Sequence, residues 1–259
     1  MKTATGDLKG IILAGGLGTR LHPLTKITNK HLLPVYNKPM IYYPISYLVD
    51  AGVTDISIVT GGNHAGDFLR LLGNGQEFGL SHINYTHQEG EGGIAQALSI
   101  TQYFCKGERV VVILGDNILE KGIQPYVANF HKQKRGARVL LKEVSDPERF
   151  GVASLQGDKI TEIEEKPKNP KSNFAVTGIY MYDETVFDII KTLKPSKRGE
   201  LEITDVNNAY IRRGELEYDI LDGWWTDSGT FDSLLHANHL VAKKAFLDKK
   251  NEKKNGGKK

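Results

Sequence analysis

The sequence is poor in cysteine and has no long apolar run. Cys105 is its single cysteine, so no disulfide can form within the chain. No stretch approaches the roughly 20 consecutive apolar residues that span a bilayer, and residues 1–7 contain no apolar signal core. These absences predict a cytoplasmic protein with no membrane partner. Cys105 follows an apolar-patterned segment, and we expect it to be a buried small hydrophobic residue.

Excess positive charge is also scarce outside one end of the chain. The formal net charge is +3, but residues 243–259 hold eight lysines against two acidic residues, so residues 1–242 are mildly acidic. Nucleic-acid-binding domains concentrate basic residues on a folded face, and this distribution argues against a nucleic-acid partner. We expect residues 247–259 to be a disordered, solvated lysine-rich tail, with a weak anionic contact as the alternative. Residues 1–8 are expected to be a flexible extension.

Several common site patterns are missing. A Walker loop needs Gly-x-x-x-x-Gly-Lys-Ser/Thr, but counting from Gly15 the residues at the second glycine and the lysine are Arg20 and Leu21. A dinucleotide-binding pattern starting at Gly16 has Leu21 in place of its third glycine. The histidines show no metal-ligand spacing, and no Gly-x-Ser-x-Gly elbow exists. Nicotinamide, zinc and covalent serine chemistry are therefore not supported.

A glycine-rich loop after the first apolar run is the most informative feature present. Gly15, Gly16 and Gly18 directly follow the run, and Arg20 and Lys30 add positive charge beyond them. The backbone N–H groups of such a loop can crowd against phosphate oxygens. The pattern predicts a nucleoside triphosphate site, and an ordinary strand-to-helix turn without ligand is the alternative.

Apolar periodicity predicts an α/β fold with one continuous, mostly parallel sheet and helices on both faces. The predicted strands span residues 9–13, 55–60, 82–86, 109–114, 139–144, 151–155, 159–164, 176–182 and 216–220. The predicted helices span residues 40–51, 65–72, 94–104, 123–134, 184–192, 203–213 and 231–245. We expect one Rossmann-like domain over 9–246, with the nucleotide side mainly in 9–135 and the sugar side mainly in 136–230. In such sheets the ligand lies beyond the carboxyl ends of the strands, where the glycine loop and Asp116 are expected to meet.

Two aspartates are candidate ligands of a magnesium ion. Asp116 follows a buried strand, and Asp227 lies in a short segment before the last helix. Each alone is ambiguous, because an aspartate in either place can cap a helix or a turn. Magnesium takes one or two carboxylates from a protein and fills its other positions with water and phosphate. Two aspartates converging on a triphosphate fit that demand.

The segment 162–167 and the segment 198–205 supply candidates for a sugar phosphate. Lys166 would bind the phosphate and Glu165 would accept hydrogen bonds from sugar hydroxyls, although an edge strand with a solvated charged face is the alternative. Arg198 is a second candidate for phosphate, because a guanidinium matches phosphate oxygens.

Gln88 and Gly93 are suited to reading a base. A glutamine amide can donate and accept at once, as the imide edge of thymine or uracil requires, and a glycine lets the ring approach the backbone. A flexible glycine loop with an exposed glutamine is the alternative.

In combination, these motifs resemble the sugar-1-phosphate nucleotidyltransferases, and among them the short form of the glucose-1-phosphate thymidylyltransferases. The resemblance covers residues 9–245 and rests on Gly-Gly-x-Gly-Thr-Arg, Leu-Leu-Pro-Val-Tyr-Asn-Lys-Pro, Gly-Gly-Ile-Ala-Gln-Ala, Ile-Leu-Gly-Asp-Asn, Asp-Pro-Glu-Arg-Phe-Gly-Val, Glu-Glu-Lys-Pro, Ala-Val-Thr-Gly and Arg-Gly-Glu-Leu-Glu-Ile-Thr-Asp-Val. It implies Mg²⁺-assisted in-line attack of glucose 1-phosphate on the α-phosphorus of dTTP, giving dTDP-glucose and pyrophosphate.

The resemblance also implies roles for individual residues. Nucleotide positions fall on Leu13, Gly15, Gly16, Gly18, Thr19, Arg20, Gln88, Gly93 and Asp116. Sugar-phosphate positions fall on Gly151, Glu165, Lys166, Val176 and Arg198. The catalytic positions are Arg20, Lys30 and Lys166, and the metal positions are Asp116 and Asp227. The substrates dTTP and glucose 1-phosphate are the expected partners, and the chain is expected to be a homo-oligomer, a dimer or a tetramer.

Three departures and two alternatives qualify this hypothesis. His31 and Phe150 stand where many relatives have glutamine and tyrosine, and longer relatives continue with further helices that form a regulatory nucleotide site. The same chemistry with UTP or another sugar 1-phosphate is one alternative. A non-catalytic nucleotide-sensing subunit is another, and the joint presence of five site charges argues against it.

Overall fold

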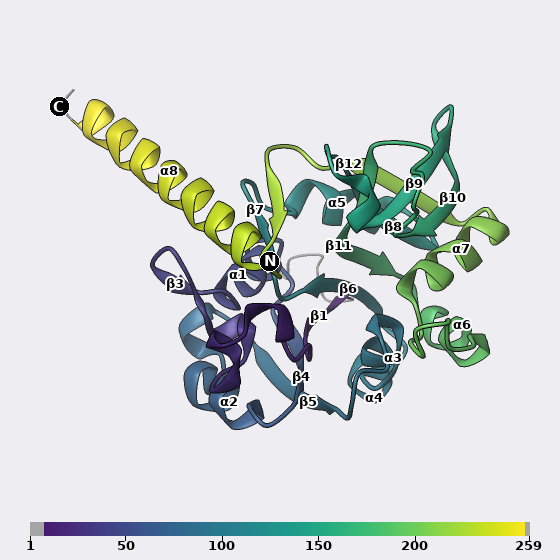
Figure 1. The fold of residues 1–259 in the computed structure, drawn as a ribbon, viewed down its shortest axis with the longest axis horizontal. Coiled ribbons are helices and arrows are strands. Elements are labelled where there is room, and N and C mark those ends of the chain that lie inside the picture. The colour runs from purple at the N-terminus through teal and green to yellow at the C-terminus, as the bar shows by residue number, and fades with distance from the viewer. Residues whose placement is uncertain (1–7, 257–259) are drawn as a thin grey trace.

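Nine strands form one sheet in the computed structural model, which describes residues 8–256 (Figure 1). The strands are β1 (Leu8–Ala14), β4 (Asp55–Gly61), β5 (His82–Gln88), β6 (Arg109–Leu114), β8 (Ala137–Glu143), β9 (Gly151–Gln156), β10 (Lys159–Glu165), β11 (Phe174–Tyr182) and β12 (Leu216–Ile220). Two small ladders pair β2 (Pro34–Val35) with β3 (Lys38–Pro39), and β7 (Asn117–Leu119) with β13 (Trp225–Asp227). The predicted extension 1–8 lies outside the described residues except for Leu8, which begins β1.

The predicted mostly parallel sheet is confirmed. Its main path runs β5-β4-β1-β6-β11-β9-β10, and β8 joins β11 to β12. Strands β1, β4, β5 and β6 pair in parallel, as do β8 and β12, whereas β11 is antiparallel to β6, β8 and β9. The apolar run of β6 lies between β1 and β11, and Val110 to Ile113 are fully buried. A continuous apolar run therefore occupies a strand that is covered on both faces.

Helices cover both faces of the sheet, as predicted. They are α1 (Tyr42–Asp50), α2 (Ala65–Leu72), α3 (Ile94–Ser99), α4 (Gln102–Cys105), α5 (Gln124–Lys132), α6 (Val186–Thr192), α7 (Ile203–Arg213) and α8 (Phe231–Gly256). Alternate residues of β1 face opposite layers. Ile11 and Leu13 contact the core beneath α3, α6 and α7, whereas Ile12 and Ala14 contact the core beneath α1, α2 and α5. Cys105 is buried in the first of these cores, as expected.

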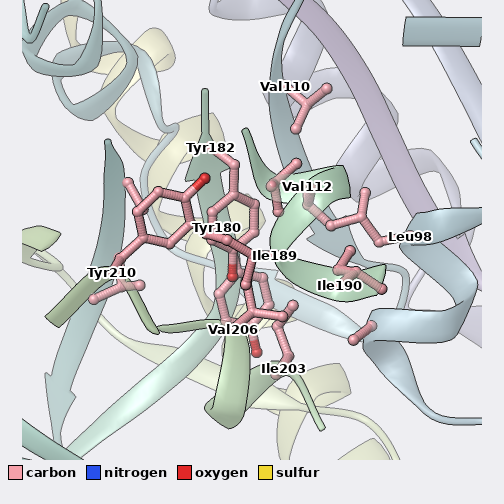
Figure 2. Packing of buried hydrophobic residues seen from close by; sticks show 14 of the residues in the cluster. Leu98, Val110, Val112, Tyr180, Tyr182, Ile189, Ile190, Ile203, Val206 and Tyr210 are labelled. Carbon is pink, nitrogen blue, oxygen red and sulfur yellow. The ribbon is translucent and has the colours of Figure 1, made fainter. Parts of the chain in front are cut away.

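Three stacked tyrosines attach α7 to the sheet (Figure 2). The rings of Tyr180 and Tyr182 lie 6.0 Å apart, and those of Tyr182 and Tyr210 lie 5.7 Å apart. Two of the three hydroxyls are hydrogen-bonded inside the core. The Tyr182 hydroxyl donates to Asn207 at 2.7 Å, and the Tyr210 hydroxyl donates to Asp183 at 2.8 Å. Buried hydroxyls that are fully paired make such a core specific in geometry. The middle and later part of α7 are thereby fixed relative to β11.

The helix predicted over 94–104 is two helices, α3 and α4, separated at residues 100–101. Thr101 donates its hydroxyl to the carbonyl of Leu98 at 2.7 Å. Local side-chain bonds of this kind compete with the continuous helical pattern. Periodicity alone was therefore right about the buried face and wrong about continuity.

The last helix is longer than predicted. α8 continues to Gly256, whereas the sequence predicted its end at residue 245 and a disordered tail over 247–259. Its first turns contact the body through Ala237 and Val241, and its later part projects away from the sheet (Figure 1). Lysine and glutamate are good helix formers, so the lysine-rich segment can continue the helix. Residues 257–259 lie outside the described residues.

Large apolar side chains are exposed on α8, including Phe231, Leu235 and Phe246. The predicted dimer or tetramer stays a prediction, because only one chain is described. No helix between Leu8 and Gly256 is long and apolar enough to cross a membrane.

The end of β4 fixes the glycine loop by close contact. A Cβ placed on Gly61 would lie 2.2 Å from the carbonyl oxygen of Gly15, a backbone atom that cannot move without shifting the loop. Five residues further on, Gly66 in α2 has nothing within 4 Å of the same added atom. Alanine at position 61 therefore tests the close contact, whereas alanine at position 66 tests only the change in backbone freedom.

Replacing Gly61 by alanine is expected to destabilise the fold by about 1–3 kcal/mol, the usual cost of overpacking. The matched variant Gly66→Ala is expected to be neutral or to stabilise by up to about 1 kcal/mol, because alanine restricts the unfolded chain and favours helix. Urea unfolding of both variants measures these changes. A Gly61→Ala protein as stable as Gly66→Ala would contradict the contact.

Candidate active site

A cleft of about 670 Å³ opens at the carboxyl ends of the parallel strands. It has walls from both halves of the chain, and the glycine loop and Asp116 meet in it as expected. The predicted residues that line it are Leu13, Gly15, Gly16, Arg20, Lys30, Gln88, Gly93, Asp116, Gly151, Glu165, Lys166, Val176 and Asp227. Three predicted residues, Gly18, Thr19 and Arg198, are not among its lining residues. Thr19 instead lines a neighbouring hollow with His22 and His64.

The small ladder of β7 and β13 brings the two aspartates together. Asp227 is the register partner of Asn117, the residue that directly follows Asp116. This pairing joins segments more than 100 residues apart in the chain. Asp227 therefore does not act as the cap of α8, whose first turn is closed by reciprocal bonds between Thr230 and Ser233.

Asp116 is held by a cation from the glycine-loop side. Lys30 Nζ lies 2.5 Å from Asp116 Oδ2, and both side chains are largely buried. Burial by itself would raise the pKa of Asp116, but the charge of Lys30 and the hydrogen bonds from Lys30 and Asn117 outweigh it, so the pKa lies well below its usual range. Asp116 is thus a carboxylate at neutral pH, in contact with the predicted catalytic lysine.

Asp227 has the opposite electrostatic balance. Burial raises its pKa, and the negative charge of Asp116 raises it further. Arg149 opposes both effects, because its Nη2 lies 3.1 Å from Asp227 Oδ1. Arg20 lies close by as well, since a Cβ on Gly229 would lie 3.1 Å from Arg20 Nη2 and 3.2 Å from Asp227 Oδ2.

Sequence reasoning missed Asn117, Arg149 and Trp225, which all line the cleft. Asn117 donates to Asp116 at 3.0 Å and accepts from the Trp225 indole at 2.7 Å. It also accepts from the backbone N–H of Gly178 at 2.9 Å. One buried amide therefore connects three strands around the aspartates. The asparagine directly after Asp116 was the available sequence signal.

On the sugar side, Glu165 is fixed from α7. Thr204 donates to Glu165 Oε2 at 2.7 Å rather than capping its own helix. Lys166 has a left-handed backbone, with φ of 45°, and its Nζ lies 3.7 Å from Glu165 Oε1. A non-glycine residue in this region is uncommon and is found most often where geometry serves a site.

Arg198 is engaged elsewhere in the fold. Its guanidinium bonds both carboxylate oxygens of Glu202, at 3.1 and 2.7 Å, and lies 3.8 Å from Glu165. A phosphate contact by Arg198 would require this pair to open. The contact stays a prediction.

Gln88 ends β5 at the opposite wall. Its Nε2 donates to Gln96 Oε1 at 2.6 Å and to the Gly93 carbonyl at 3.2 Å. Gly93 has φ of 91°, and a Cβ there would lie 2.6 Å from the Leu201 carbonyl oxygen. Glycine is thus required at this position by both conformation and space. Gln88 lines this end of the cleft, and Gln96 fixes its amide from behind.

Comparison with known proteins agrees with this geometry. The family model for nucleotidyl transferases matches residues 9–244. The chain belongs to the nucleotidyl transferase family. It is 47% identical over 90% of its length to a glucose-1-phosphate thymidylyltransferase of Neisseria meningitidis, 82% of which is covered, and 46% identical with the same coverage to that of Mycolicibacterium smegmatis.

Solved structures agree with this family assignment. A Bacillus anthracis crystal structure attributed to a glucose-1-phosphate thymidylyltransferase, in complex with sucrose, is 60% identical, has a TM-score of 0.87 and matches 90% of this chain and 94% of its own. A UDP-glucose pyrophosphorylase complexed with UDP-glucose is 26% identical, with a TM-score of 0.80 over 91% and 98% of the chains.

Nucleotidyl transferases of this family generally use a divalent metal. The donor set in this chain fits one, because Asp116, which directly precedes β7, and Asp227, which ends the paired strand β13, supply hard carboxylate oxygens. Among the described residues no group of three or more histidine, cysteine, aspartate or glutamate side chains forms a metal cluster. The fit is therefore to a metal that keeps most positions for water and phosphate.

His31, one of the departures from the family pattern, is a buried residue of this nucleotidyl transferase rather than an exposed one. Its Nδ1 lies 2.7 Å from Asn29 Oδ1, and a Cβ on Gly115 would lie 2.7 Å from its Cδ2. Burial, followed by the charge of Lys30, lowers the pKa of His31 to about 3. The ring is neutral in the folded protein at physiological pH.

The low pKa of His31 predicts a pH-dependent stability. Between about pH 6.5 and pH 3 the unfolded state binds a proton that the folded state does not, so the free energy of unfolding falls by about 1.4 kcal/mol per pH unit as the pH drops. His31→Gln is expected to remove this contribution. Between pH 7.5 and pH 5 its free energy of unfolding should fall by about 2 kcal/mol less than that of the parent. Urea unfolding at both pH values measures it, with exposed His22→Gln as control. Equal pH dependence in His31→Gln and the parent would contradict the burial of a neutral ring.

Proposed function

We propose that the chain transfers the thymidylyl group of dTTP to α-D-glucose 1-phosphate, giving dTDP-glucose and pyrophosphate, with Mg²⁺ bound by Asp116 and Asp227. One observation carries the proposal. A single cleft holds two adjacent carboxylates, with cations from the nucleotide side and the sugar side around them. The thymidylyltransferase names of the relatives support the choice of substrates.

Direct in-line attack fits this site. Phosphoryl transfer relies on positioning and charge stabilisation, which the paired carboxylates and cations of the cleft can supply. A phosphate oxygen of glucose 1-phosphate attacks the α-phosphorus of dTTP, and pyrophosphate leaves. The metal, when bound, neutralises charge shared by the reacting phosphates. No covalent enzyme intermediate is required.

The protein's own groups supply the rest. Gly15 and Gly16 leave backbone N–H groups free to approach the triphosphate. Arg20 stabilises the departing pyrophosphate, and Lys30 stabilises charge at the reacting phosphate. These roles require Lys30 to exchange Asp116 for a phosphate oxygen when substrate enters.

The sugar side orients the attacking group. Lys166 holds the phosphate of the sugar, with Arg198 joining if its pair with Glu202 opens. Glu165, already fixed by Thr204, accepts hydrogen bonds from sugar hydroxyls, and Gly151 and Val176 line the ring site. A rigid acceptor discriminates between sugars because a misplaced hydroxyl leaves the carboxylate unpaired.

UTP is the second candidate nucleotide, favoured by the likeness to UDP-glucose pyrophosphorylase. Gln88 Oε1 can accept the imide N–H that thymine and uracil share, while Gln88 Nε2 keeps its bonds to Gln96 and to the Gly93 carbonyl. The two bases themselves differ only at one methyl group. The non-catalytic alternative has no support from the cleft, since a sensor has no need of the paired charges at Lys30 and Asp116.

A panel of four triphosphates with glucose 1-phosphate tests the proposal through pyrophosphate release. We expect dTTP to give the highest kcat/KM, UTP to be used measurably, and ATP and GTP to be poor substrates. UTP differs from dTTP by the base methyl, which accounts for roughly 10- to 200-fold, and also by the 2′-hydroxyl. Gln88→Ala is expected to reduce pyrimidine selectivity, whereas exposed Gln102→Ala leaves it unchanged. Efficient use of ATP would refute the role of Gln88, and no release with any pyrimidine would refute the function.

A further inference from the structure

Each aspartate of the cleft is paired with a different cation. Lys30 holds Asp116 from the glycine-loop side at 2.5 Å, and Arg149 holds Asp227 from the sugar side at 3.1 Å. Two adjacent carboxylates in a low-dielectric site repel each other. The two cations relieve that repulsion in the protein without substrate.

Arg149 is a shared rather than a fixed partner. Its Nη1 lies 2.7 Å from Asp146 Oδ2 while its Nη2 contacts Asp227, and its side chain is 40% exposed. The guanidinium also lies over the ring of Phe150, 5.0 Å from the centroid. Asp146 and Phe150 can keep the side chain in place when the contact with Asp227 is lost. The arginine thus has a second support from which to exchange partners.

The position of Arg149 links the metal side to the sugar side. It ends the short 3-10 turn Pro147–Arg149, and β9 begins two residues later at Gly151. The carbonyl of Phe150 accepts the backbone N–H of Lys166 at 3.0 Å. A guanidinium released from Asp227 therefore stays beside the residues that would hold the sugar phosphate.

A divalent cation and a guanidinium compete for the same carboxylate. Metal binding at Asp227 removes most of the attraction that Oδ1 exerts on Arg149, and two cations side by side repel each other. The planar fork of a guanidinium also matches two phosphate oxygens. Arg149 then has a better partner in the phosphate of the sugar.

We propose that Arg149 is a metal-displaced latch, which neutralises Asp227 in the metal-free site and moves to the phosphate of the sugar 1-phosphate when metal binds. The proposal rests on the proposed function, because it uses the metal site at Asp116 and Asp227. Binding of metal and of sugar phosphate is then positively coupled, and the coupling is reciprocal. Arg149 thus weakens metal binding in the absence of the sugar phosphate, and it helps to bind the sugar phosphate once the metal is bound.

The test measures Mn²⁺ binding to the free enzyme by isothermal titration calorimetry, with and without glucose 1-phosphate. Arg149→Gln is expected to bind Mn²⁺ roughly 2- to 10-fold more tightly than the parent without substrate, the range for losing a partly exposed ion pair. Lys166→Gln, which removes an equal charge from the same cleft but has no contact with the aspartates among the described ion pairs, is expected to change the affinity less.

Glucose 1-phosphate is expected to tighten Mn²⁺ binding to the parent and to have little effect on Arg149→Gln. Unchanged or weaker Mn²⁺ binding by Arg149→Gln, an equal gain in Lys166→Gln, or coupling that survives in Arg149→Gln would each overturn the latch. The variant Asp227→Asn distinguishes failure of the latch from failure of the proposed function. If the parent binds no Mn²⁺, or Asp227→Asn binds it as the parent does, the metal site and the latch both fail.

Discussion

The pairing of β7 with β13 is the contact on which the site depends. It places Asp227 across from Asn117 and so beside Asp116, although two carboxylates in a desolvated cleft are unfavourable together. The cost appears in the raised pKa of Asp227, which burial and Asp116 cause. Lys30 and Arg149 offset it with one contact each.

The sheet turns this local arrangement into a two-substrate site. The parallel strands β1 and β6 end at the glycine loop and at Asp116, while β9, β10 and β11 form the opposite wall. Asn117 lies at the junction, with bonds to Asp116, to the Trp225 indole and to the backbone of Gly178. The stacked tyrosines attach α7 to β11 (Figure 2), and Thr204 of the same helix donates to Glu165 on β10. The predicted nucleotide and sugar sides are thus built on one continuous sheet.

Much of this frame could be predicted because its signals are local. The buried run of β6, the glycines after β1 and the helices on both faces follow from periodicity and residue type. The ends of neighbouring parallel strands must meet, which placed Gly15 near Asp116 without any knowledge of the structure.

What the sequence did not reveal depends on distant partners. No local pattern announces the three-residue strand β13, whose partner lies on β7, or the pair of Arg149 with Asp227. At the break between α3 and α4, the Thr101 side chain bonds the backbone of Leu98, a local contact that periodicity does not reveal. The charge-rich composition of the end of α8 predicts disorder, but lysine and glutamate also favour helix, and the helix continues. Arg198 had a matching side chain, but Glu202 binds it in this fold.

We infer that Asp227 is kept in an electrostatically unfavourable position because the reaction needs its carboxylate there. Its raised pKa means that Asp227 binds a proton more tightly in the folded than in the unfolded state. The ionised side chain therefore lowers the free energy of unfolding at neutral pH, and this destabilisation diminishes as the pH falls. The most direct measurement compares Asp227→Asn with the parent at pH 7.5, by thermal unfolding and by dTDP-glucose formation with Mg²⁺. The account predicts an equal or higher Tm together with at least a roughly 100-fold loss of kcat, since phosphoryl transfer depends on charge stabilisation. A variant that loses stability, or that keeps near-parental turnover, would contradict it.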